Sequence, residues 1–184
     1  MTRTDFAKAS IDDCQLTIRA LDVKCGAILV LLLAPLTGAG SIFDSLESIE
    51  PRGCGYFLGA LFFGTWAVSL LSLIRGLAPL DNPSLHILDH KNFTGTFYRG
   101  GLFNFGYSDA LLRRSVIASL KKVSDAVAEL PKNDAEILNE LTFEHMKLCY
   151  IREVKIRLLR WGIGFAEVWV LTGCVIYLFA RYGS

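Results

Sequence analysis

The chain has 184 residues and a formal net charge of +1, so it is one polypeptide unit without the charge excess that would suggest a nucleic-acid polymer as partner. Its cysteines occur without a CxxC pair and without a nearby histidine, which predicts neither a disulfide framework nor a metal site. They are Cys14, Cys25, Cys54, Cys149 and Cys174.

Hydrophobic residues make up 52% of the chain and concentrate in three runs long enough to cross a membrane. The runs are Cys25–Phe43, Gly53–Ile74 and Trp161–Ala180; the first two contain no charged residue, and the third contains only Glu167. At about 1.5 Å per helical residue, each run reaches roughly 28–33 Å, the thickness of the hydrocarbon core of a bilayer. The sequence therefore predicts an all-α membrane protein with three transmembrane helices.

Basic residues are distributed so unevenly around these runs that they predict an orientation. Seventeen of the nineteen Lys and Arg residues fall on one side of the membrane, and only Arg52 and Arg181 fall on the other. Because positive charge is retained in the cytoplasm during insertion, we expect a cytoplasmic N-terminus and a periplasmic C-terminus. The predicted parts are a cytosolic helix over 1–24, spans over 25–43, 53–75 and 161–180, and a helical cytosolic sensor region over 76–160, inserted between the second and third spans.

Capping signals predict where the cytosolic helices begin. Thr4 is the expected N-cap of the N-terminal helix, which should run into the first span. Another helix is expected over 109–130, with apolar residues on one face. Asn133 and Glu136 form a partial capping box for a last helix, which meets no Gly or Pro before Trp161 and should continue into the third span.

The sequence contains no recognisable arrangement of an enzyme active site. GxxxxGK[ST], GxSxG and HExxH motifs are missing, and no spacing among the histidines suggests zinc coordination. A solvated or capping role is expected for His86, His90 and His145. The protein is therefore predicted not to be an enzyme and to hold no metal or cofactor.

Glu167 lies inside the third predicted span, about 10 Å beyond Arg160 by helical rise. Ionisable residues at such depth are rare and usually face a bundle interior or water. One interpretation is that Glu167 lines a pore or makes a polar contact between helices. The other is that its side chain snorkels back to the cytosolic interface, or pairs with Arg160 or Lys24.

Charged and aromatic residues near the inner membrane surface form a candidate ligand site. Asp22 and Lys24 lie at the mouth of the first span and Lys155 lies before the third, where opposite charges can pair across helices or anchor the interface. Segment 92–107 has six aromatic residues, four glycines and one charge, Arg99. Its aromatics can stack on a nucleobase beside a cation that neutralises a phosphate, or can plug the cytosolic bundle.

Three separated segments carry a family resemblance. They are ALDVKCGAILVLL (Ala20–Leu32), LLSLIRGLAP (Leu70–Pro79) followed by TFYRGGLFNF (Thr96–Phe105), and YIREVKIRLL (Tyr150–Leu159). An Asp-x-Lys at the first span, an aromatic–glycine loop after the second and a lysine before the third occur in this order in the transmembrane effector family of the Pycsar antiphage systems. The chain resembles that family from about residue 15 to residue 180.

The resemblance implies a bacterial inner-membrane protein that responds to a nucleotide second messenger made on phage infection. In Pycsar systems the messenger is cyclic CMP or cyclic UMP, and the response is loss of membrane integrity and arrest or death of the host cell. Related effectors in CBASS operons respond to cyclic oligonucleotides. The ligand expected here is therefore one of these nucleotides.

The leading hypothesis is an antiphage effector that binds a cyclic nucleotide and disrupts the membrane as a homo-oligomer, since three spans cannot enclose a pore. Small residues make the second span a candidate packing face, namely Gly55, Gly59, Ala60 and Gly64. The predicted phosphate contacts are Arg99 and Lys155, with Tyr98 or Phe97 stacking on the base and Asp22 and Lys24 beside them.

The alternative hypothesis is a structural or accessory membrane subunit that binds a protein partner through its cytosolic helices. A small transporter is disfavoured, because only Glu167 interrupts the apolar spans.

Overall fold

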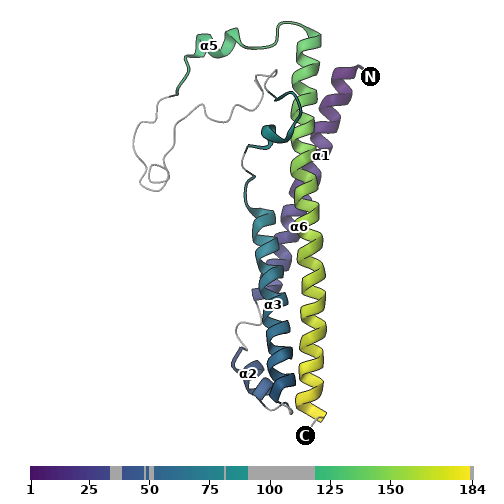
Figure 1. Cartoon of the computed structure of the whole chain (residues 1–184). Coiled ribbons are helices and arrows are strands. Elements are labelled where there is room, and N and C mark those ends of the chain that lie inside the picture. The colour runs from purple at the N-terminus through teal and green to yellow at the C-terminus, as the bar shows by residue number, and fades with distance from the viewer. Residues whose placement is uncertain (34–38, 48, 50–51, 81, 91–118, 183–184) are drawn as a thin grey trace. The chain divides into compact units, whose positions relative to one another are not determined.

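The computed structural model describes the whole chain except residues 34–38, 48, 50–51, 81, 91–118 and 183–184. Its described residues form helices and connecting loops, with no strand among them (Figure 1). The helices are α1 (Arg3–Leu33), α2 (Ala39–Glu47), α3 (Arg52–Leu77), the 3-10 helix η2 (Pro83–His86), α5 (Val123–Ala128) and α6 (Asp134–Tyr182). The prediction of an all-helical protein is confirmed for these ranges.

Helix α6 begins at the predicted capping box. The backbone N–H of Glu136 donates to Asn133 Oδ1 at 2.9 Å, and Glu136 Oε2 accepts the N–H of Lys132 at 2.6 Å. Two N–H groups at the start of the helix are thereby satisfied. The helix then continues for 49 residues through Trp161, as the run without Gly or Pro predicted.

Helix α1 begins two residues earlier than predicted, and Thr2 rather than Thr4 is its cap. The N–H of Asp5 donates to Thr2 Oγ1 at 3.1 Å, and the N–H of Thr2 donates to Asp5 Oδ2 at 3.0 Å. Thr2 has an acidic residue three positions later, whereas Thr4 has Ala7, so only Thr2 can form a reciprocal box. The hydrogen bonds from Thr2, its backbone N–H first, hold the pKa of Asp5 below its ordinary value.

The helix predicted over 109–130 is wrong in its later half. Only α5 is helical there, and the segment 119–122 before it is not. Ser119 Oγ donates to the carbonyl of Lys121 at 2.8 Å, and Lys121 Nζ pairs with Glu129 at 2.9 Å. Such local side-chain bonds compete with helical hydrogen bonds, which explains the interruption. The earlier half, up to residue 118, lies outside the described residues.

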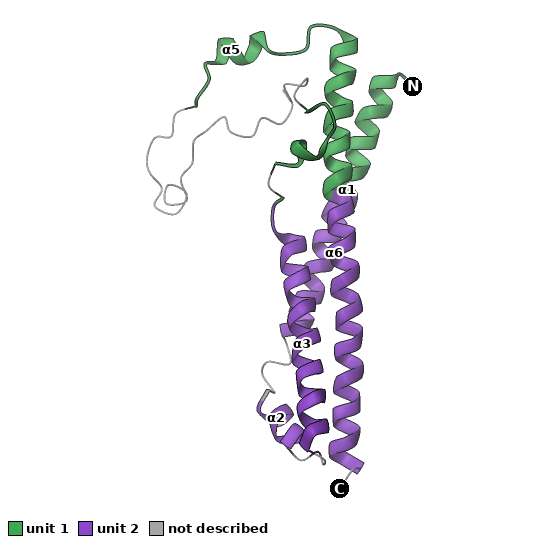
Figure 2. Cartoon of the chain, viewed as in Figure 1, with its two compact units in different colours: residues 1–16, 80–151 green, residues 17–79, 152–184 purple. Residues whose placement is uncertain are grey.

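The chain divides into two compact units, and α1 and α6 contribute to both (Figure 2). Unit 1 comprises residues 1–16 and 80–151, and unit 2 comprises residues 17–79 and 152–184. In unit 1, Ala7 and Ile11 of α1 pack on Leu141 of α6. Ile137, Leu138 and Leu148 of α6 are half-buried and pack against this cluster.

In unit 2, α1 and α6 run parallel to each other and antiparallel to α3 (Figure 2). One buried cluster joins all three helices and consists of Leu21, Cys25, Leu32, Leu73 and Leu159. A second cluster joins Phe62 of α3 to Ile176 of α6 and to Ile49. These contacts form a three-helix bundle along the apolar runs.

Helix α2 occupies part of the segment that was predicted to be the end of the first span and the outer loop. It packs on α3, with the rings of Phe43 and Phe63 stacked at 5.1 Å between centroids. Within the predicted span over 25–43, α1 reaches Leu33 and α2 begins at Ala39, and residues 34–38 lie outside the described residues.

Two helices in the described part of the chain, α3 and α6, are long and apolar enough to cross a membrane. Only 28% and 11% of their apolar windows are buried within the chain, so these surfaces face outward, unlike the core helices of soluble proteins. Helix α1 is not apolar over a sufficient length, because the charged residues Arg19, Asp22 and Lys24 lie close before its apolar last turns. The first predicted span stays a prediction.

Candidate functional site

Three helices of unit 2 meet at the side chain of Lys155, a residue of α6 that is only 8% exposed. Its Nζ donates to Oδ1 of Asp22 on α1 and, at 2.8 Å, to the carbonyl oxygen of Gly76 on α3. An ammonium group has three N–H donors, so these contacts use two of them. We call this arrangement the lysine junction. It ties one point on each of three helices to a single positive charge.

The partners of Lys155 follow from helix geometry and from charge. Gly76 lies in the last turn of α3, where carbonyl oxygens lack an intrahelical partner and carry partial negative charge. The side chain of Asp22 is 38% exposed and that of Lys155 is 10% exposed, so solvent reaches the carboxylate while the ammonium is nearly enclosed. An enclosed ammonium needs acceptors that replace its lost water, and the junction supplies a carboxylate and a carbonyl.

Close packing beside the junction fixes α3 to both other helices. Gly162 of α6 lies so near Leu73 of α3 that a Cβ atom on it would approach Leu73 Cγ to 2.7 Å. Ser69 Oγ donates to the carbonyl of Gly162 at 2.7 Å. Trp66 Nε1 donates to the carbonyl of Leu32 on α1 at 2.9 Å. The junction therefore rests on helices whose separation is set by direct contacts.

Two of the six predicted ligand residues, Asp22 and Lys155, are brought together by the structure. Lys24 is exposed and lies outside the junction. The other three lie outside the described residues, and they are Phe97, Tyr98 and Arg99. The carbonyl of Gly76 was missed, because a backbone oxygen leaves no signature in residue identity.

Glu167 is exposed on α6, and it has no ion pair or hydrogen bond within the described ranges, including with Arg160 or Lys24. Pairing with either cation is therefore not seen. Among the residues that the structure describes, Glu167 also makes no polar contact with another helix of the same chain. Contact of Glu167 with water or with a second copy stays a prediction.

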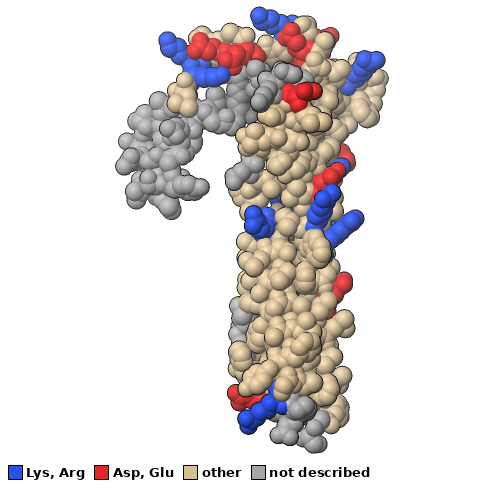
Figure 3. Space-filling view, viewed as in Figure 1, with Lys and Arg blue, Asp and Glu red and all other residues tan. Residues whose placement is uncertain are grey.

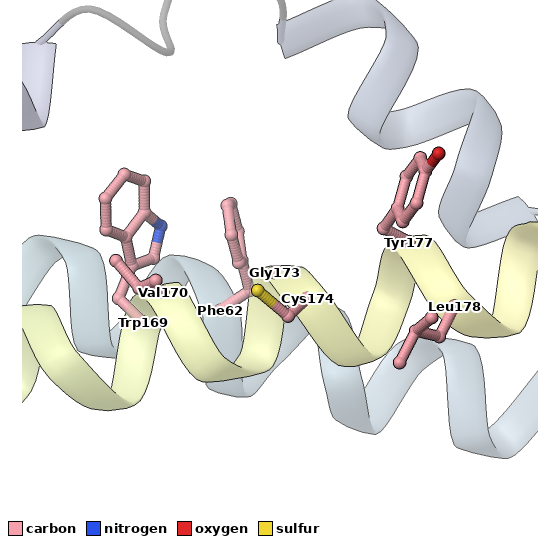
Figure 4. Close-up of a pocket in the computed structure, with 7 residues that line it drawn as sticks. All are labelled: Phe62, Trp169, Val170, Gly173, Cys174, Tyr177 and Leu178. Atoms are coloured by element: carbon pink, nitrogen blue, oxygen red, sulfur yellow. The ribbon is translucent and has the colours of Figure 1, made fainter.

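The pocket of unit 2 is apolar and is unsuited to a nucleotide. Its volume is about 460 Å³, and it lies along α3 and α6 beside Phe62, Trp169 and Tyr177 (Figure 4). No charged residue belongs to its described lining. The buried Nε1 of Trp169 has no hydrogen-bond partner within the described chain. A phosphate would find no cation here, so this pocket fits an apolar group.

The histidines do not all behave as predicted. His86 stacks on Tyr150 with 4.4 Å between ring centroids, and His90 Nδ1 lies 3.1 Å from the carbonyl of Ile87. His145, in contrast, lies beside Cys14 and Cys149. The prediction that the cysteines have no nearby histidine is therefore wrong. The fold brings together residues that are far apart in the sequence, although the spacing of His145 and Cys149 on one helix was a usable signal.

Comparison with known proteins identifies the chain at the level of a family. The model of PycTM, described as the Pycsar effector protein domain, matches residues 6–181. Neither the curated proteins nor the solved structures include a match to this chain. The family match spans all three segments that carry the resemblance in the sequence, and that resemblance is confirmed.

Proposed function

Because the chain belongs to the family of the Pycsar effector protein domain, we propose that it is an antiphage defence effector that a cyclic nucleotide switches into a membrane-disrupting state. The proposed action is physical rather than enzymatic. The nucleotide favours one packing of the helices over another and thereby shifts the population of effector molecules. Cyclic CMP, cyclic UMP and cyclic oligonucleotides are the candidate signals.

The proposed topology has three spans in the bacterial inner membrane, with the N-terminus in the cytoplasm and the C-terminus in the periplasm. It is supported by the charges of unit 2, where seven of nine Lys and Arg residues lie at the end that holds the lysine junction. Arg52 begins α3 and Arg181 lies in the last turn of α6, both at the other end, and the face shown in Figure 3 is largely uncharged between the two ends. Retention of basic residues in the cytoplasm then places the junction at the inner surface.

The lysine junction is the observation that carries the proposed switch. Asp22 is partly exposed and holds Lys155 by a charge-assisted bond, so an anionic ligand can compete with this carboxylate for the ammonium. In this exchange the phosphate of the ligand replaces the Asp22 carboxylate as the anion bound to Lys155. Because the two contacts are of similar strength, a small difference in free energy decides which of them forms. Loss of the Asp22 contact removes the ionic link between α1 and α6 and leaves the apolar contact of Leu21 and Cys25 with Leu159 to hold them in unit 2. Arg99, with Tyr98 or Phe97, is proposed to supply the remaining contacts to the nucleotide.

Oligomerisation is proposed to use an open face of α3. Gly55 and Gly59 are covered by Leu46 of α2, so they do not belong to that face. A Cβ atom added at Gly64 would meet nothing within 4 Å, and Ala60 is exposed. Small residues permit close approach of helices in lipid, which favours Ala60 and Gly64 as contacts between copies.

Dye leakage from liposomes tests the proposed function. Purified protein in liposomes should release dye on addition of one nucleotide from a panel of cyclic CMP, cyclic UMP and cyclic oligonucleotides. Lys155→Met should weaken binding of that nucleotide about ten- to hundredfold by calorimetry, since one charge-assisted contact is lost. Lys8→Met is the matched control, because Lys8 is exposed on α1 and is not among the predicted ligand residues. If none of the nucleotides in the panel triggers leakage, the result would favour the accessory-subunit alternative.

Cysteine labelling tests the proposed orientation independently. Glu47→Cys and Ser119→Cys are introduced where Cys54 and Cys174 have been replaced by serine. A membrane-impermeant maleimide added to intact spheroplasts should label the residue at 47 and should label the residue at 119 only after permeabilisation. The opposite pattern would reverse the orientation and remove the cytosolic junction.

A further inference from the structure

Unit 1 contains a cluster of three side chains with the donor atoms of a soft-metal site. Cys14 lies on α1, and His145 and Cys149 lie one helical turn apart on α6. The two Sγ atoms are 3.8 Å apart, and Cys149 Sγ is 3.5 Å from His145 Nε2. All three donor atoms lie within 4.8 Å of one another.

Two of these separations match edges of a zinc coordination tetrahedron. With Zn–S bonds of about 2.3 Å and Zn–N bonds of about 2.05 Å, tetrahedral angles place two sulfurs about 3.8 Å apart and a sulfur and a nitrogen about 3.6 Å apart. The separation of the two sulfurs and that of Cys149 Sγ from His145 Nε2 agree with these values to about 0.1 Å. A single cation can therefore contact both thiolates and the imidazole with little movement of the backbone.

We propose that Cys14, His145 and Cys149 bind a divalent cation of the zinc class. Thiolate and imidazole donors select zinc over magnesium or calcium, which prefer oxygen ligands. Three protein donors leave one tetrahedral position for water or another ligand. The cation would join the first half of α1 to α6 across the apolar contact of Ile11 with Leu141.

The cluster has a path to solution. Cys14 is 2% exposed, but His145 and Cys149 are half-buried. His145 also lines a pocket of about 460 Å³ beside Phe6 and Ser10 of α1. A hydrated ion can enter through this pocket and lose its water at the imidazole, as a metal site requires an entry path.

A disulfide between Cys14 and Cys149 is the competing chemistry for the same atoms. It would not use His145, whereas the imidazole lies within bonding reach of Cys149. In the proposed orientation unit 1 is cytosolic, where thiols are kept reduced. The geometry and the compartment therefore both favour the cation.

Metal titration of the full-length protein in detergent tests the site. Reduced, metal-free protein should bind one Zn²⁺ per chain in competition with a chromogenic chelator. Co²⁺ in its place should give the thiolate charge-transfer and d–d absorption of a tetrahedral site. Cys14→Ser and His145→Gln should each weaken Zn²⁺ binding by more than about tenfold. Removing a group that only hydrogen-bonds a metal ligand already costs about ten- to hundredfold in affinity, and these variants remove a ligand itself. Cys54→Ser is the matched control and should bind as the unmodified chain does.

A second measurement avoids variants altogether. Zn²⁺ should slow alkylation of Cys149 in the unmodified chain, with Cys54 as the internal reference, and a chelator should restore the rate. The proposal is overturned if the unmodified chain binds no stoichiometric Zn²⁺, or if Cys14→Ser binds it as well as Cys54→Ser does. Isolation of a Cys14–Cys149 disulfide from protein that takes up no metal would likewise overturn it in favour of the redox pair.

Discussion

The two units use the same two helices, α1 and α6, but pack them with different chemistry. In unit 2 the buried residues are apolar or small, and the buried ion is Lys155 at one end. In unit 1, Glu140, Glu144 and Lys147 are buried, and Lys147 pairs with Glu144 one turn away. Lys147 also lies 4.9 Å from the centre of the Phe143 ring. Among the described residues, buried charge is thus spread over three residues of unit 1, whereas in unit 2 it is found at Lys155.

Burial alone does not separate these charges, because the side chains of Lys147 and Glu144 are only 10% and 5% exposed. Their ion pair lies within one turn of α6, whereas Lys155 joins α6 to Asp22 of α1 and to Gly76 of α3. Changes at the lysine junction should therefore have larger effects than changes among the charges of unit 1, because they affect three helices.

Asp22→Asn should destabilise unit 2 most, by about 1.5–3 kcal/mol, because it leaves the enclosed ammonium of Lys155 without its counter-ion, although the partly exposed Asp22 site and the Gly76 carbonyl limit the loss. Thermal unfolding in detergent, followed by circular dichroism, measures the loss. The double variant Asp22→Asn/Lys155→Met should recover most of it, since no charge is then stranded. Asp44→Asn, at an exposed position of α2, is the control. Equal loss in the single and double variants would show that the charge pair is not the cause.

Glu167→Gln should reduce nucleotide-triggered leakage by more than about tenfold without preventing insertion. An ionised carboxylate inside a span costs roughly 2.5–3.5 kcal/mol, and an assembly in which Glu167 faces water relieves that cost. Glutamine removes this drive toward assembly while keeping the shape of the side chain. Leakage rates per reconstituted chain provide the measurement, with Glu153→Gln as the control outside the span. Leakage equal to that of the unmodified chain would assign Glu167 to the lipid interface.

Gly162→Ala should cost about 1–3 kcal/mol, since an added methyl group meets Leu73, which is 0% exposed and has no room to move. Gly164→Ala is the matched control two residues later, where a Cβ atom meets nothing within 4 Å. This control should be neutral or slightly stabilising, because alanine favours a helix. Unfolding midpoints of the two variants in the same detergent give the comparison. Similar midpoints would mean that α3 and α6 are not in tight contact there.

Asn133→Ala should have the smallest effect, about 1 kcal/mol, through loss of the N-cap of α6 in unit 1. Hydrogen exchange of the first turn of α6 should rise, while the amides of unit 2 should be unaffected. Lys132→Ala, whose backbone N–H is retained, serves as the control. A rise in exchange throughout α6 would instead show that both units unfold together.

Local rules predicted most of the helices but not the contacts among them. The apolar run from Gly53 gave α3 to within a few residues, and the box at Asn133 placed the start of α6, because both depend on neighbours in sequence. The helix predicted over 109–130 is not found at 119–122, where Ser119 Oγ donates to the carbonyl of Lys121. Opposite charges at Asp22 and Lys155 suggested a pair. Nothing local could reveal that a carbonyl of α3 completes it, or that Cys14 lies beside His145.

The hydrogen bond from Trp66 to the carbonyl of Leu32 bears on how the protein is made. Leu32 lies in the last turn of α1, and a carbonyl without a donor in hydrocarbon costs several kcal/mol. Its donor is synthesised 34 residues later, so α1 alone is an incomplete insertion unit. In the proposed topology the two helices should therefore leave the translocon as a pair. Trp66→Phe, which keeps an aromatic ring and removes the donor, should slow this release during synthesis while barely changing the packing of the finished bundle.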